Sequence, residues 1–118
     1  MGLIDWSKPA DQVWNQIRAM QPWPTAYTFL HRAGHEPARV IITDAAAVSF
    51  GIAEHPPGTL QASKTEEGES VLLGAAGKQT LVRVLELQPA GKRRMNAAEF
   101  LRGHPVQAGD RFGSEKSL

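Results

Sequence analysis

Short β-type segments separated by polar turns fill most of the middle of this 118-residue chain. They are rich in Tyr, Thr, Val and Ile, which fit a pleated, half-buried strand, and Gly and Pro mark the turns between them. Five short strands with tight connections predict a small β-barrel. A chain of this length also leaves room for only one domain. The predicted strands span residues 26–30, 39–43, 58–62, 70–74 and 79–87.

The segment 44–57 is harder to place within this pattern. Its run of alanines can extend the second strand or form a loop, and Pro56 and Pro57 close it. Both alternatives stay open from the sequence.

One helix is predicted before the strands. Val13, Ile17 and Met20 recur at the i, i+4 and i+7 spacing of an apolar helix face. Ser7 is the expected N-cap, and the two prolines within residues 21–24 end the helix.

A second, shorter helix is predicted after the strands. Asn96 is the expected cap, and Glu99 stands three residues later, at the spacing of a capping box. Phe100 and Leu101 supply the apolar side, and Gly103 marks the end.

The composition excludes several classes of protein. The chain has no cysteine, which excludes disulfide frameworks, thiolate metal sites and cysteine nucleophiles. No stretch approaches the roughly 18 apolar residues that a membrane span needs, and Asp5 follows Met1 too closely for a signal peptide. We therefore expect a cytoplasmic protein without a membrane partner.

The net charge of +1 hides an uneven distribution along the chain. Residues 1–77 carry five Lys and Arg against eight Asp and Glu, whereas residues 78–111 carry seven against three. Lys92, Arg93 and Arg94 follow one another in a predicted loop. Such a triplet is either a solvated turn or a set of phosphate contacts.

Recognisable catalytic and metal-binding motifs are missing. His31 and His35 have a four-residue spacing, but Gly34 and Pro37 predict a turn there rather than a helix that could hold a metal. The segment 74–78 lacks the spacing of a phosphate-binding loop. We therefore expect no metal site and no nucleophile in this chain.

Trp6, Trp14 and Trp23 have two possible roles. Their rings could stack on unpaired bases. Their position at the edges of the predicted first helix favours anchoring of the core.

Two longer motifs carry a family resemblance. Residues 4–10 read IDWSKPA and residues 17–28 read IRAMQPWPTAYT, while residues 85–95 read LELQPAGKRRM and residues 98–104 read AEFLRGH. These segments resemble the opening and the close of the C-terminal domain of methionyl-tRNA formyltransferase. Pro57-Gly58-Thr59 is similar to the family's strand start, and Gln21 stands where the family usually has Asn.

The resemblance implies a mainly β fold, an open barrel of about six strands related to the OB-fold, with an N-terminal helix and a short C-terminal helix. Residues 1–112 would form this domain and residues 113–118 a flexible tail. In the family, the domain follows a Rossmann-like catalytic domain and helps to hold initiator methionyl-tRNA. The catalytic domain transfers the formyl group from 10-formyltetrahydrofolate.

The family's catalytic Asn, His and Asp and its Ser-Leu-Leu-Pro segment have no counterpart here. The resemblance therefore implies a chain that is not an enzyme by itself and binds no cofactor. The 10-formyltetrahydrofolate would bind only to a catalytic domain, a partner in cis or in trans.

The resemblance also points to candidate tRNA-binding residues, which would contact phosphates and should share one continuous face. They are Lys92, Arg93 and Arg94 in the family's basic segment, with Lys78, Arg83 and Arg102 near it in sequence.

Two alternatives remain. One is a packing domain of another formyltransferase-type enzyme, acting on nucleotide sugars or folate, that touches no RNA. The other is a small-molecule site in the mouth of the barrel.

Overall fold

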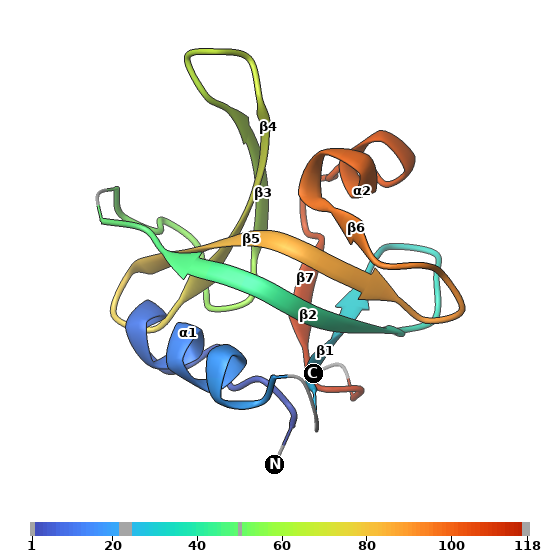
Figure 1. The fold of residues 1–118 in the computed structure, drawn as a ribbon, viewed down its shortest axis with the longest axis horizontal. Coiled ribbons are helices and arrows are strands. Elements are labelled where there is room, and N and C mark those ends of the chain that lie inside the picture. The colour runs from blue at the N-terminus through green and yellow to red at the C-terminus, as the bar shows by residue number, and fades with distance from the viewer. Residues whose placement is uncertain (1, 22–24, 50, 117–118) are drawn as a thin grey trace.

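A computed structural model describes residues 2–21, 25–49 and 51–116 and shows a curled antiparallel sheet with two helices (Figure 1). Six strands follow one another in the order β3-β4-β5-β2-β1-β7, and the short β6 pairs with β5. This confirms the prediction of a mainly β, open barrel with an N-terminal and a short C-terminal helix. The elements are α1 (Ala10–Ala19), β1 (Ala26–His31), β2 (Ala38–Ala47), β3 (Leu60–Lys64), β4 (Ser70–Ala76), β5 (Thr80–Pro89), β6 (Met95–Asn96), α2 (Ala97–Gly103) and β7 (Arg111–Gly113).

The alanines after Thr43 extend the second strand. Residues 45–47 pair with residues 82–84 of β5, and a register shift at Asp44 bends β2 on the way. The first residues of segment 44–57 therefore extend the second strand, to Ala47, and do not form a loop. Cross-strand pairing stabilises the alanines there, although their own β propensity is low.

The last strand partly closes the barrel. β7 pairs with β1, and the Phe112 N–H also donates a hydrogen bond of 2.8 Å to the Gly58 carbonyl, just before β3. Leu60 N–H donates to the Asp110 carbonyl at 3.0 Å. Gly58 has a φ of +93°, and a Cβ there would lie 2.2 Å from the Phe112 carbonyl oxygen, so glycine is required for this contact.

The sequence does not predict β7, because three residues carry too little alternation to identify a strand. β7 runs to Gly113, and the residues from 114 to 116 belong to no helix or strand. The expected flexible tail of residues 113–118 stays a prediction.

The N-terminal segment seals one side of the barrel core. Trp6 is buried and stacks on Phe112 with ring centroids 5.5 Å apart. Its indole N–H donates to the Thr28 hydroxyl at 3.1 Å, and that hydroxyl donates to the Gly113 carbonyl at 3.1 Å. Trp6 therefore anchors the fold, as expected, whereas Pro22 and Trp23 lie outside the described residues.

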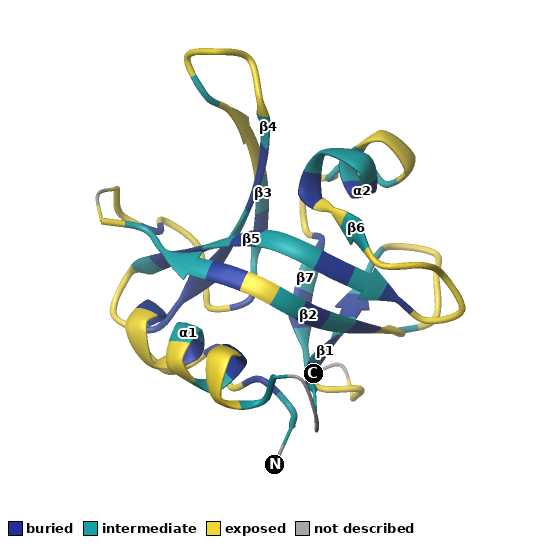
Figure 2. Ribbon diagram, viewed as in Figure 1, coloured by how far each residue is buried: buried dark blue, intermediate teal, exposed yellow. Residues whose placement is uncertain are grey.

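Helix α1 packs its apolar face on the sheet and turns its polar face outward (Figure 2). Val13 and Ile17 are buried, as their spacing predicts. The prediction that Ser7 caps this helix is wrong, because the Ser7 hydroxyl donates to the Asp5 carboxylate at 2.6 Å. The N-cap is Pro9. The Ala10 N–H, which has no acceptor within the first turn of the helix, donates to the Thr80 hydroxyl.

Candidate nucleic-acid interface

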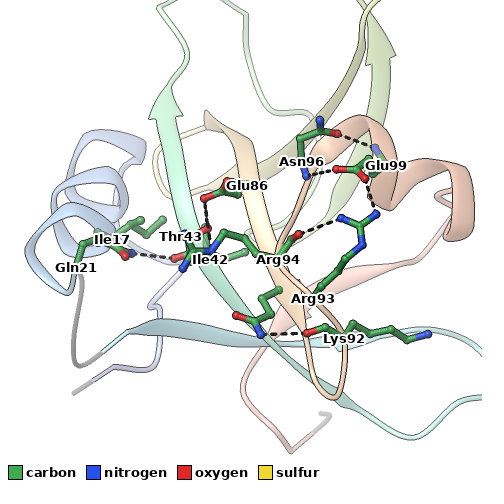
Figure 3. Close-up of polar contacts among 11 residues, drawn as sticks. Ile17, Gln21, Ile42, Thr43, Glu86, Lys92, Arg93, Arg94, Asn96 and Glu99 are labelled. Carbon is green, nitrogen blue, oxygen red and sulfur yellow. Dashed lines mark hydrogen bonds and ion pairs between the residues drawn. The ribbon is translucent and has the colours of Figure 1, made fainter.

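The predicted basic triplet lies on the exposed loop between β5 and β6, residues 90–94, which we call the basic loop (Figure 3). The Lys92 N–H donates to the Pro89 carbonyl at 3.0 Å, and the Gln88 side chain donates to the Lys92 carbonyl at 3.0 Å. Gly91 takes a φ of +74° in the turn. These bonds hold the backbone in place and leave the Lys92 ammonium pointing away from the loop.

Helix α2 holds a carboxylate against Arg93. The predicted capping box forms, with Glu99 N–H donating to the Asn96 side chain at 2.8 Å and Asn96 N–H donating to the Glu99 carboxylate at 3.2 Å. Arg93 donates to the other carboxylate oxygen at 2.6 Å. The hydrogen bond from Arg93, followed by that from Asn96, lowers the pKa of the Glu99 carboxyl below its usual range. Glu99 therefore stays charged and offsets the charge of Arg93.

Two further predicted cations also have carboxylate partners. The Arg94 Nε lies 3.9 Å from a carboxylate oxygen of Glu86, and a guanidinium nitrogen of Arg83 lies 3.3 Å from a carboxylate oxygen of Glu69. The pairs are at least partly exposed to solvent. Exposed ion pairs of this kind contribute only about 0–1 kcal/mol, so a competing anion can displace the carboxylate.

The six predicted contacts lie on different elements of the fold. Lys92, Arg93 and Arg94 gather on the loop, and Arg102 lies on α2 close enough to Glu99 to stabilise its charge. Arg83 lies within β5.

Lys78 lies in the turn before β5, at the end of that strand opposite to the basic loop. The ten residues of β5 span about 30 Å at about 3.3 Å per residue, so Lys78 is far from the basic loop.

The structure places further cations, outside the six predicted ones, near the basic loop. The Ala90 N–H donates to the Arg39 carbonyl at 2.9 Å, which brings the start of β2 beside the basic loop. The Arg39 guanidinium lies 4.1 Å from the centroid of the Tyr27 ring. Arg32 in the turn between β1 and β2 and Arg111 in β7 line one further pocket. Counting charge along the chain assigned Arg32 and Arg39 to the acidic first part, and only strand pairing reveals their neighbours.

We call residues 31–39, 88–103 and 107–111 together the basic end of the barrel. These segments carry seven Lys and Arg against three Asp and Glu, whereas the rest of the chain carries six against nine. The acidic turn with Glu66, Glu67 and Glu69 lies at the tip of the β3–β4 hairpin, which projects from the barrel body (Figure 1). The fold therefore gathers Arg32 and Arg39, from the acidic first part of the chain, with the cations of the late part, and it holds the acidic turn away from the barrel body.

The described residues offer little else that could carry chemistry. Among them, no three His, Cys, Asp or Glu side chains are close enough to hold a metal ion. No helix in the described part of the chain is long and apolar enough to cross a membrane.

Comparison with known proteins gives a consistent family. The family model described as "Formyl transferase, C-terminal domain" matches residues 1–105. A methionyl-tRNA formyltransferase of Bacillus velezensis is 41% identical over 110 residues, which cover 93% of this chain and 32% of that protein. That of Symbiobacterium thermophilum is 44% identical over 110 residues, covering 93% of this chain and 31% of the relative. That of Bacillus subtilis is 39% identical over 111 residues, which cover 94% of this chain and 32% of that protein. The chain thus spans about a third of the length of the curated relatives that it matches.

Proposed function

This chain belongs to the formyl transferase C-terminal domain family, and on that premise we propose that it is the tRNA-binding accessory domain of a methionyl-tRNA formyltransferase-like protein. The catalytic domain of such a protein, in cis or in trans, would transfer a formyl group from 10-formyltetrahydrofolate to initiator methionyl-tRNA. This chain would supply affinity for the tRNA and no catalytic group. Its role would belong to translation initiation in the cytoplasm.

The observation that carries this proposal is the basic end of the barrel. Seven Lys and Arg side chains lie on its three segments, and only three carboxylates accompany them. Cations that replace the counterions of a nucleic acid backbone gain affinity without reading sequence. Contacts of this kind would position a tRNA on the domain without distinguishing one tRNA sequence from another.

The ion pairs that the arginines already form with carboxylates determine how readily each cation can contact a tRNA phosphate. Arg93 is exposed, and its bond to Glu99 competes with solvent as well as with any incoming phosphate. Lys92 and Arg102 form no ion pair within the described part of the chain. We therefore expect Lys92 and Arg102 to contact phosphate at the least cost, and Arg93 and Arg94 to exchange a carboxylate for a phosphate.

One observation favours the alternative of a packing domain that touches no RNA. A groove of about 340 Å³ lies between β3 and the segment after α2, with Leu101, Pro105 and Val106 on its apolar side. Such a groove can receive side chains of a catalytic domain. The other alternative, a small-molecule site in the mouth of the barrel, has no support beyond the presence of surface pockets and stays a prediction.

Binding of the purified chain to initiator tRNA over a series of salt concentrations tests the proposal. We expect the logarithm of the affinity to fall linearly with the logarithm of the salt concentration. A variant with Lys92→Gln, Arg93→Gln and Arg94→Gln should lower this slope by up to about 2.7, at about 0.9 for each lost phosphate contact.

The matched control removes three exposed charges outside the basic end, through Lys8→Gln, Lys64→Gln and Lys116→Gln. This control should keep most of the affinity and the slope. Equal losses in the two triple variants would contradict a localised interface. No binding at about 50 mM salt, where phosphate contacts are strong, would favour the packing domain.

A further inference from the structure

A second cationic feature lies beside the basic loop, in a pocket of about 350 Å³. The β1–β2 turn forms one wall of this pocket, and the segment that leads into β7 forms the other. Its lining residues include four side chains that carry or can take up positive charge: His31, Arg32, His35 and Arg111. Ala33, Pro37, Ala108 and Gly109 complete the wall.

Strand pairing and a tight turn bring these side chains together. His31 in β1 pairs directly with Arg111 in β7, so the two side chains stand on the same face of the sheet. The His35 N–H donates to the Arg32 carbonyl at 3.1 Å, and Gly34 takes a φ of +80° between them. The turn is therefore folded back on itself and directs Arg32 and His35 to the same pocket.

One imidazole in the pocket has a defined proton. His31 Nε2 lies 2.6 Å from the Ser114 carbonyl oxygen. Because a carbonyl oxygen only accepts hydrogen bonds, Nε2 is the donor. This bond fixes the ring at the pocket wall.

Among the described residues, no Asp or Glu side chain lines this pocket. Glu36 is exposed and is not part of the lining, and the buried Asp110 carboxylate accepts a hydrogen bond of 2.9 Å from the Gln107 N–H. In the described part of the chain, neither Arg32 nor His35 forms a salt bridge. The arginines of the β5–β6 loop differ in this respect, since Arg93 and Arg94 each face a carboxylate.

We propose that this pocket is a phosphate-binding site. Guanidinium groups bind phosphate oxygens through paired, charge-assisted hydrogen bonds, and an imidazole N–H of His35 can add a further donor. The inference goes beyond the proposed function, because the pocket takes inorganic phosphate whether or not the chain binds tRNA.

Titration of the 118-residue chain with inorganic phosphate, exchanged against chloride at constant ionic strength, tests the site. The readout is the set of backbone amide signals in two-dimensional NMR spectra. We expect saturable shifts confined to residues 31–37 and 107–114. The double variant Arg32→Gln, His35→Gln should weaken phosphate binding at least tenfold.

A control with Lys8→Gln and Lys64→Gln removes exposed charge outside the basic end and outside the pocket. It should keep the affinity for phosphate within about twofold, since exposed charges at a distance are screened by salt. Shifts that do not saturate, or equal weakening in the two double variants, would overturn the proposal.

A competition experiment identifies the source of the phosphate. If the group belongs to a nucleic acid backbone, inorganic phosphate at constant ionic strength weakens tRNA binding by the wild type but not by the Arg32→Gln, His35→Gln variant. If the source is a small phosphorylated molecule, phosphate saturates the pocket and tRNA binding does not respond. Failure of tRNA to bind would overturn the proposed function alone, and failure of the phosphate titration would overturn the pocket alone.

Discussion

Replacement of Thr28 by valine tests how the barrel is closed. The Thr28 side chain is fully buried, accepts the indole N–H of Trp6 at 3.1 Å and donates to the Gly113 carbonyl at 3.1 Å. Valine keeps the shape of the side chain but removes both hydrogen bonds. The buried Trp6 N–H then loses its acceptor, which costs about 1–3 kcal/mol. With the second bond lost and one more methyl buried, we expect the free energy of unfolding to fall by about 2 kcal/mol.

Urea unfolding followed by circular dichroism measures this change. At a slope of about 2 kcal/mol per molar urea, a loss of about 2 kcal/mol lowers the midpoint by about 1 M. Thr28→Ser is the control, because it keeps the hydroxyl and loses only a methyl group, at about 1 kcal/mol. A Thr28→Val midpoint within about 0.3 M of the wild type would refute the reasoning.

A double-mutant cycle with Trp6→Phe separates the hydrogen bond from the packing of the ring. We expect a coupling of about 1 kcal/mol between the two positions, because the single changes remove the same bond. Strictly additive effects would show that the hydroxyl does not stabilise Trp6.

Three further predictions concern turns and charge. Gly77→Ala should lower the free energy of unfolding by about 2–3 kcal/mol in urea unfolding, because its Cβ would lie 1.9 Å from a carbonyl oxygen of the N-terminal segment. The control Gly103→Ala, with nothing within 4 Å of its Cβ, should leave stability unchanged or slightly raised. Gln79→Gly should raise the melting temperature, since a φ of +59° costs a side-chain-bearing residue about 1 kcal/mol. Because Arg93 lowers the pKa of Glu99 in the folded state, this pair stabilises the protein above the ordinary Glu pKa and loses its effect as pH falls through the lowered value. The stability difference between wild type and Glu99→Gln should therefore be largest at pH 7 and vanish in acid.

Local sequence signals predicted many elements because the interactions that form those elements are themselves local. The capping box of Asn96 and Glu99 joins residues three apart, and the apolar spacing of Val13 and Ile17 depends only on the helix period. The Ser7 cap failed because the helix begins only after Pro9, where the hydroxyl of Thr80, distant in sequence, accepts from the Ala10 N–H. β7 was missed because its pairing with β1 and Gly58, rather than its own composition, makes it a strand.

The sequence by itself determined the mainly β class, the two helices, the family resemblance and the existence of a basic loop at residues 92–94. Only the tertiary structure decided which charges act together. It separates Lys78 from the basic loop along β5, joins Arg39 to that loop through Ala90, and sets His31 opposite Arg111. The physical reason is that electrostatic interaction depends on distance in space, and strand pairing brings together residues that lie many positions apart in the chain.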